Sequence, residues 1–223
     1  MDILQNLIDI KNEIPEGVRL VAVSKYHPAE VLLEAYNAGQ RIFGENKAQE
    51  MKAKHEVLPE DIKWHFIGHL QSNKIKYIIS YVSMIEAVDT LKLLSEINQY
   101  AIKAGRIIPC LLEIHLAKEE TKFGFSFQEC RDMLKEGEWK KLTNVSISGV
   151  MGMASNIDDQ NQILNEFSSL KDFFNELKKD FFAESPDFKE ISMGMSNDYK
   201  LAIQAGSTLV RIGTKIFGER IYK

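Results

Sequence analysis

The stretch Val18-Arg19-Leu20-Val21-Ala22-Val23-Ser24-Lys25 is an apolar run that ends abruptly in a lysine, and a helix-like stretch over residues 28–37 follows it. The chain repeats this pairing, as repeated βα units around a parallel sheet do. Strand-like runs cover residues 18–24, 41–44, 64–67, 82–87, 107–114, 145–151, 190–193 and 208–212, and helix-like stretches follow the first seven, for instance over 90–104, 158–179 and 197–204. We therefore predict a single (β/α)8 barrel of the TIM type, with an open doubly wound sheet as the alternative.

The composition is that of a globular protein. With 223 residues, 44% of them hydrophobic and 27% charged, the chain is expected to form one domain over residues 1–223. A net charge of −4 argues against a broad nucleic-acid-binding surface. No segment has the apolar length of a membrane span, and the N-terminus lacks the features of a secretory signal. We expect a cytoplasmic protein with no nucleic-acid or membrane partner and, with Cys110 in an apolar run, no disulfide framework.

Lys25 marks the first candidate site. It follows an almost wholly apolar strand, so it is expected at the strand's carboxyl end, the face on which barrels carry their active or binding sites. A partly desolvated ammonium there loses its proton more readily, as imine formation with an aldehyde requires. Taken alone, the segment is more typical of a surface lysine that begins a loop.

The segments after the seventh and eighth strands predict a phosphate site. Ser196 and Asn197 are suited to cap the following helix, where free backbone N–H groups and a hydroxyl attract an anion. Simple capping is the more common use of such residues. Gly213 lets the backbone approach a ligand closely, and Thr214 offers a hydroxyl and an amide. Barrels most often hold a phosphate group at these two loops, so we predict that the segments converge on one anion.

Arg211 shares a strand face with Gly213 and is expected to point into the barrel. A buried guanidinium is costly without a partner. Two hypotheses stay open at this point. Arg211 faces a heteroaromatic ring nitrogen, which its charge keeps unprotonated, or it forms a structural ion pair with Glu86 or Glu113.

Five blocks of the chain resemble the signature of the pyridoxal phosphate homeostasis proteins. They are residues 21–25, 43–46, 64–74, 192–196 and 210–218, and they occur in order over nearly the whole chain. The resemblance implies a fold-type III barrel like the N-terminal domain of bacterial alanine racemase, with pyridoxal 5′-phosphate as cofactor. It also implies the site residues: Lys25 as the imine lysine, Ser196, Gly213 and Thr214 around the phosphate, Arg211 facing the pyridine nitrogen, and Asn46 lining the pocket.

The chain departs from the family pattern at Lys47, where the family usually has an aromatic residue. A second lysine near the pocket could compete for the aldehyde or attract the phosphate. The sequence also ends at Lys223, shortly after the last strand. We therefore expect no second β domain of the kind that supplies alanine racemase with its opposing tyrosine.

The resemblance and the residues together favour a cofactor carrier over an enzyme. Racemisation needs proton transfer on both faces of the reacting centre, which one lysine does not provide. An unprotonated pyridine nitrogen beside Arg211 would also be a weaker electron sink. We predict a protein of cytoplasmic pyridoxal phosphate homeostasis, with pyridoxal-phosphate-dependent apoenzymes as recipients. The alternatives are a racemase-like enzyme or Schiff-base aldolase, and a barrel that serves as an interaction module.

No metal site is expected. His65 and His69 are four residues apart, a spacing that presents two metal ligands only on a helix, and His65 lies in a strand-like run.

Overall fold

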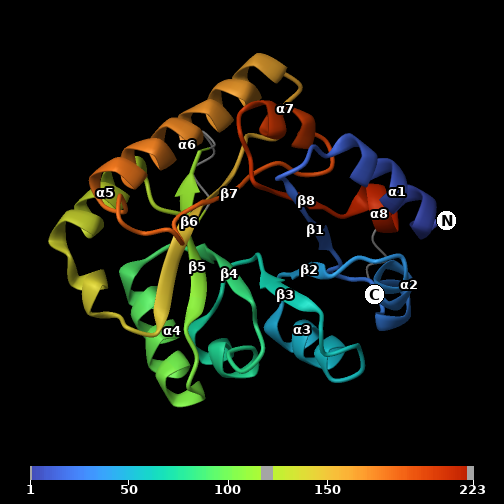
Figure 1. Ribbon diagram of the computed structural model, residues 1–223, viewed down its shortest axis with the longest axis horizontal. Helices are drawn as coiled ribbons and strands as arrows, with labels where there is room; N and C mark the ends of the chain where they lie inside the picture. The colour runs from blue at the N-terminus through green and yellow to red at the C-terminus, as the bar shows by residue number, and fades with distance from the viewer. Residues whose placement is uncertain (1, 117–122, 220–223) are drawn as a thin grey trace.

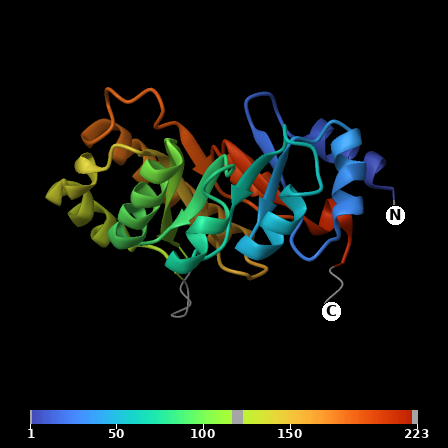
Figure 2. The same ribbon diagram turned by 90° about the horizontal axis from the view of Figure 1, so that it is seen from below.

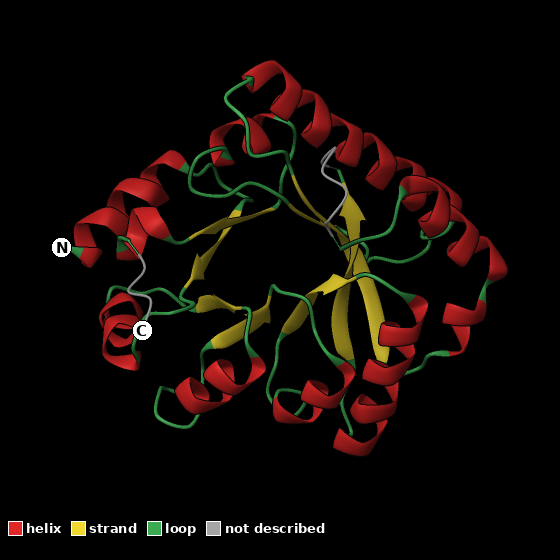
Figure 3. Cartoon of the chain, turned by 180° about the vertical axis from the view of Figure 1, so that it is seen from behind, coloured by secondary structure: helices red, strands yellow, loops and turns green. Residues whose placement is uncertain are grey.

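The fold is a closed barrel of eight parallel strands in sequence order, seen in a computed structural model that describes residues 2–116 and 123–219 (Figure 1). The last strand pairs with the first, Leu209 opposite Arg19 and Ile212 opposite Ala22. The predicted (β/α)8 barrel is therefore confirmed, and this closure excludes the open doubly wound sheet. Figure 3 shows the strands as an inner ring with the helices outside it.

All eight predicted strands are present, with ends within two residues of the expected positions. They are β1 Arg19–Val23, β2 Ile42–Glu45, β3 Lys63–Phe66, β4 Met84–Val88, β5 Ile108–His115, β6 Val145–Met153, β7 Glu190–Ser192 and β8 Leu209–Ile212. Parallel strands around a barrel place their carboxyl ends on one face. The residues that follow each strand are therefore brought together.

The helices follow the predicted order with three differences. They are α1 Ile3–Glu13, α2 Ala29–Asn37, α3 Ala48–His55, α4 Leu91–Ala104, α5 Phe127–Glu136, α6 Gln160–Asp180, α7 Tyr199–Gln204 and α8 Thr214–Phe217, with 3-10 helices η1 Ser72–Tyr77 and η2 Glu138–Lys141. The connection from β3 to β4 contains η1 rather than an α-helix. The other two differences are α1, which precedes the first strand, and α8, which follows the last; Asn6 joins them by donating to the carbonyl of Ile216 at 3.0 Å.

The hydrophobic core has two parts, because alternate strand residues face opposite sides of the barrel wall. Outward-facing residues such as Phe43, Trp64 and Phe66 pack beneath the helices. A smaller cluster fills the barrel interior: Val21, Met84, Ala87, Leu111, Met151 and Leu209. Helices α1 and α2 cover the side of the barrel opposite α5 (Figures 1 and 2).

Within the described ranges, no helix has both the length and the apolar character that a membrane crossing needs. Cys110 and Cys130 are both free thiols in the core.

Candidate functional site

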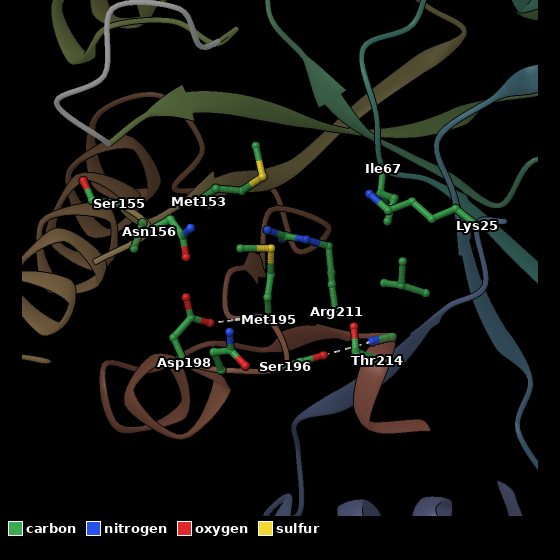
Figure 4. Close-up of a pocket in the computed structure, with 14 residues that line it drawn as sticks. Lys25, Ile67, Met153, Ser155, Asn156, Met195, Ser196, Asp198, Arg211 and Thr214 are labelled. Carbon is green, nitrogen blue, oxygen red and sulfur yellow. Dashed lines mark hydrogen bonds between the residues drawn. The ribbon is translucent and has the colours of Figure 1, made fainter. Parts of the chain in front are cut away.

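A cavity of about 220 Å³ opens at the carboxyl ends of the strands (Figure 4). Five of the six predicted site residues line it: Lys25, Ser196, Arg211, Gly213 and Thr214. They come from the ends of β1 and β8 and from the loop after β7. Segments separated by up to 189 positions, from Lys25 to Thr214, thus meet at one place.

Lys25 reaches the cavity because β1 ends beside it. Val21, Ala22 and Val23 are buried, and the pairing of β1 with β2 and β8 fixes where the strand ends. Lys25 itself is partly exposed, and its side chain extends into the cavity (Figure 4). The amine therefore has access to both the cavity and solvent.

The loop after β7 forms one edge of the cavity. The backbone N–H of Met195 donates to the Asp198 carboxylate at 2.5 Å, and burial raises the pKa of Asp198. The hydroxyl of Ser196 accepts from the N–H of Gly213 at 3.3 Å, which links this loop to the one after β8. The two loops thus form one surface.

Gly213 allows the chain to turn from β8 into α8 against β1. A Cβ at this position would lie 2.9 Å from the carbonyl oxygen of Val23, closer than side-chain atoms normally come. The N–H groups of Ser196, Asn197 and Thr214 have no acceptor among the residues that the structure describes. Unsatisfied amides at helix starts, with the hydroxyls of Ser196 and Thr214, form a donor set suited to an anion.

Arg211 lines the cavity and is also bound by buried groups of the barrel interior. Its guanidinium donates to the hydroxyl of Ser192 at 2.5 Å and to the carbonyl of Gly152 at 3.0 Å, and lies 3.9 Å from the Glu86 carboxylate. The Ser192 hydroxyl donates to the Glu86 carboxylate at 2.5 Å, and the Nδ1 atom of His65 lies 2.6 Å from the other oxygen of that carboxylate. Of the two candidate ion-pair partners, Arg211 therefore has Glu86. Arg211 also lines the cavity, where its guanidinium is accessible to a ligand.

Burial and charge act against each other in this buried network. Burial raises the pKa of Glu86, but the hydrogen bond from His65 and the charge of Arg211 bring it below the usual range. Burial lowers the pKa of Arg211, and the charge of Glu86 opposes that shift. Glu113, the other candidate partner, lies next to the network, and burial together with the charge of Asp89 raises its pKa to about 7.

The structure places Asn46 outside this cavity. Asn46 lies beyond the end of β2 and lines a neighbouring depression with Lys47 and His69. The backbone of Gly68 packs against the Asn46 side chain: a Cβ added at Gly68 would lie 2.7 Å from the Asn46 Cβ. Ile67, the residue before Gly68, lines the cavity instead. The family resemblance implied that Asn46 lines the pocket, but β2 ends at Glu45 and Asn46 lies in the depression beside the cavity.

Lys47 is exposed and does not line the cavity. Its ammonium lies 4.8 Å from the centre of the Tyr26 ring, at the distance of a cation–π contact. Lys25 is thus the one lysine of the described chain that lines this cavity.

Three polar residues that line the cavity were not predicted as site residues from the sequence. Ser155 and Asn156 line the cavity from the loop after β6, and Asp198 from the loop after β7. Their place in the loops that follow β6 and β7 was a usable signal, because every loop at this face is a candidate. Met153, at the end of β6, and Met195, in the loop after β7, also line the cavity.

The histidine pair has separate partners. His65 contacts Glu86 and His69 contacts Asp89 at 3.0 Å. Across residues 2–116 and 123–219, no group of three or more histidine, cysteine or acidic side chains could hold a metal ion.

Comparison with known proteins agrees over nearly the whole chain. The family model "Alanine racemase, N-terminal domain" matches residues 2–221. A pyridoxal phosphate homeostasis protein of Aquifex aeolicus is 37% identical over 92% of this chain and 88% of its own length. One from Schizosaccharomyces pombe is 39% identical over 92% of this chain and 85% of its own.

Solved structures also resemble this chain over nearly its whole length. PipY of Synechococcus elongatus, determined without pyridoxal phosphate, superposes on this chain with a TM-score of 0.88 at 36% identity. The match covers 97% of this chain and 100% of the PipY chain. The form with pyridoxal phosphate bound gives 0.86 at 34% identity and the same coverage. A Clostridium difficile alanine racemase, 16% identical, shares the fold with a TM-score of 0.75, and this chain spans 57% of its length. The chain therefore belongs to the family of pyridoxal phosphate homeostasis proteins, built on the barrel of the alanine racemase N-terminal domain.

Proposed function

We propose that this protein binds pyridoxal 5′-phosphate through an imine with Lys25 and holds or delivers the cofactor rather than turning over a substrate with it. One cavity brings together the side chain of Lys25 and a set of anion donors from two loops, and this arrangement is the main support for the proposal. The bound form of PipY supports the choice of ligand.

The donor set of the cavity fits the group. The cofactor supplies an aldehyde, which condenses with a primary amine, and a phosphate. Lys25 supplies the amine. The hydroxyls of Ser196 and Thr214 and the N–H groups of Ser196, Asn197 and Thr214 supply the anion donors, whereas the N–H of Gly213 donates to Ser196. The Asp198 carboxylate also lines the cavity, where it accepts from the N–H of Met195. Charge-assisted hydrogen bonds of this kind are among the stronger ones in proteins.

Arg211 is the candidate neighbour of the pyridine nitrogen. Its guanidinium is fixed by Ser192 and Gly152, so it presents a permanent positive charge to the cavity. Such a charge disfavours protonation of a ring nitrogen beside it. The ring would then stabilise negative charge poorly, which suits storage of the cofactor better than chemistry with it.

The groups that line the cavity also favour a carrier. Among the lining residues in the described part of the chain, the titratable ones are Lys25, Asp198 and Arg211, with no tyrosine or histidine. Arg211 stays protonated and Asp198 accepts from a backbone amide. Among the described lining residues, neither a tyrosine nor a histidine is placed to transfer a proton on a second face, as inversion of a centre requires. We infer that pyridoxal-phosphate-dependent apoenzymes receive the cofactor.

Uptake of pyridoxal 5′-phosphate by purified variants tests the binding proposal. The wild-type protein and Lys47→Ala, the matched control, should develop the visible absorption of an imine, whereas Lys25→Ala should stay colourless. Equal absorption in Lys25→Ala would overturn the role of Lys25. A wild-type protein that takes up no cofactor would favour the interaction-module alternative.

Assays of amino-acid racemisation and retro-aldol cleavage by the loaded protein test the carrier role. We expect no turnover above that of free cofactor with amino acids. Turnover that scales with protein concentration and disappears in Lys25→Ala would make the protein an enzyme.

A further inference from the structure

The turn that carries Lys25 adopts a costly backbone conformation. The N–H of His27 donates to the carbonyl of Ser24 at 3.1 Å and closes the turn around Lys25 and Tyr26. Tyr26 has a φ of 69°, and within the described ranges it is the one non-glycine residue with a positive φ. A side-chain-bearing residue keeps this conformation only where its surroundings over-determine it. Something outside the turn must therefore fix it.

A buried lysine and a glutamate of α3 hold the two peptide groups that flank Lys25. The Lys54 ammonium donates to the carbonyl of Ser24 at 2.8 Å, in the peptide before Lys25. The Glu50 carboxylate accepts from the N–H of Tyr26 at 2.7 Å, in the peptide after Lys25. Lys54 also donates to Glu50 at 2.7 Å, so the two contacts are joined.

Glu45, at the end of β2, completes the cluster. Its Oε1 atom accepts from Lys54 and from the hydroxyl of Ser24, both at 2.6 Å. The side chains of Glu45 and Lys54 are almost fully buried. The three N–H groups of the Lys54 ammonium thus have three acceptors: Ser24, Glu45 and Glu50.

The cluster lies on the outer side of the barrel wall. Phe43 and Glu45 face the α3 side of β2, whereas Gly44 lies on the inner side against Val21. None of the three charged residues lines the cavity that Lys25 enters. They therefore lie within reach of the Lys25 backbone but not of a ligand beside its amine.

Stability alone is a weak reason for this arrangement. A buried ion pair often contributes no more to folding than apolar side chains of similar size, because the charges lose their hydration. A charge cluster does, however, impose directional hydrogen bonds that apolar packing cannot. Here those bonds end on the two peptide groups that decide where the Lys25 side chain points.

We propose that Lys54, Glu50 and Glu45 are positioning residues for Lys25, which aim its amine at the cavity by fixing the peptide groups on both sides of it. The proposal rests on the proposed function, in which Lys25 forms the imine. It predicts that the cluster controls the covalent step and leaves binding of the phosphate end largely unchanged.

Two probes separate these steps. Pyridoxal 5′-phosphate reports imine formation by visible absorption in stopped flow. Pyridoxine 5′-phosphate, an alcohol that cannot form an imine, reports the non-covalent site by calorimetry. The variants are Lys54→Met, Lys54→Arg and Glu50→Ala, with Lys52→Met as the matched control, since Lys52 lies on the same helix and contacts Glu56 instead.

Lys54→Met and Glu50→Ala are expected to slow imine formation by about tenfold or more, with less than about threefold change in the dissociation constant of pyridoxine 5′-phosphate. Lys54→Arg should recover part of the rate, and Lys52→Met should match the wild type. Glu50 is partly exposed, so its variant keeps the test decisive if Lys54→Met does not fold.

Wild-type rates in both variants, or equal losses with both probes in Glu50→Ala, would overturn the positioning role. Lys25→Ala distinguishes this from failure of the proposed function. If that variant still forms the imine, Lys25 is not the imine lysine. If it does not, while Lys54→Met and Glu50→Ala react normally, the positioning role alone is wrong.

Discussion

Arg211 shows how one side chain can serve both folding and a site. Buried in the barrel, it lies 3.9 Å from Glu86, and Ser192 bridges the two by hydrogen bonds at 2.5 Å. Removal of one member of a buried pair leaves the other charge without compensation. The position therefore tolerates little change, whatever ligand occupies the cavity.

Arg211→Met should lower the free energy of unfolding by about 3–5 kcal/mol, because Glu86 then stays buried without its cation. Arg211→Met combined with Glu86→Gln should recover part of that loss. Urea unfolding of both variants and of Glu86→Gln measures the effect. A double variant as unstable as the sum of the single ones would show that the two residues do not interact.

Glu113 makes stability depend on pH. Burial and the charge of Asp89 raise its pKa from 4.5 to about 7. The folded state then binds the proton more tightly than the unfolded chain does. The stabilisation is complete below about pH 4.5 and is lost as the pH rises through about 7.

When the pH is raised from about 5 to about 8, the free energy of unfolding should fall in both proteins. The fall should be roughly 2 kcal/mol smaller in Glu113→Gln than in the wild type, at about 1.4 kcal/mol per pKa unit. The contribution of Glu45, whose pKa burial also raises to about 7, stays in both proteins and cancels. Urea midpoints at the two pH values measure the difference. Parallel pH profiles would mean that Glu113 is ionised throughout.

At the scale of elements, β6 and β7 meet at a glycine. Gly149 has a φ of 150°, and an added Cβ would lie 1.8 Å from the carbonyl oxygen of Glu190. No rearrangement of a side chain relieves such an overlap with backbone. Gly105, at the end of α4, has a φ of 65° but nothing within 4 Å of the added atom.

Gly149→Ala should therefore cost more than about 3 kcal/mol, because the paired strands must separate, and Gly105→Ala only about 1 kcal/mol for its backbone conformation. Thermal and urea unfolding compare the two variants directly. Similar losses would show that the close approach of β6 to β7 is not a constraint.

The loops after β7 and β8 carry a prediction about ligand binding. Ser196→Ala and Thr214→Val should each weaken pyridoxal 5′-phosphate binding about tenfold or more, since a hydrogen bond to a charged group contributes about 1.5–3 kcal/mol. Pyridoxal, which has no phosphate, serves as the control ligand. An equal loss for pyridoxal would place the phosphate elsewhere.

The barrel and most of the residues that line the cavity could be predicted from the sequence. Apolar runs such as residues 18–24 indicate the strands, and strand ends on one face bring Lys25, Ser196 and Thr214 together. Such a pattern says which residues follow a strand. It does not say which of them turn inward. Asn46, which the family resemblance placed at the cavity, lies in the depression beside it.

Contacts that depend on packing between distant elements could not be predicted. The hydrogen bond from Lys54 to the carbonyl of Ser24 joins α3 to the end of β1. The sequence of neither segment indicates that the two are in contact. The same is true of the bridge by Ser192 between Arg211 and Glu86. Such bonds depend on how distant elements pack, which a local sequence pattern does not contain.

In the proposed function, the Lys25 amine and the loops after β7 and β8 hold one cofactor between them. Borohydride reduction of the protein loaded with pyridoxal 5′-phosphate, followed by peptide mass mapping, tests it most directly. We expect a phosphopyridoxyl adduct on the peptide that contains Lys25. An adduct on Lys47, or one spread over several surface lysines, would contradict it.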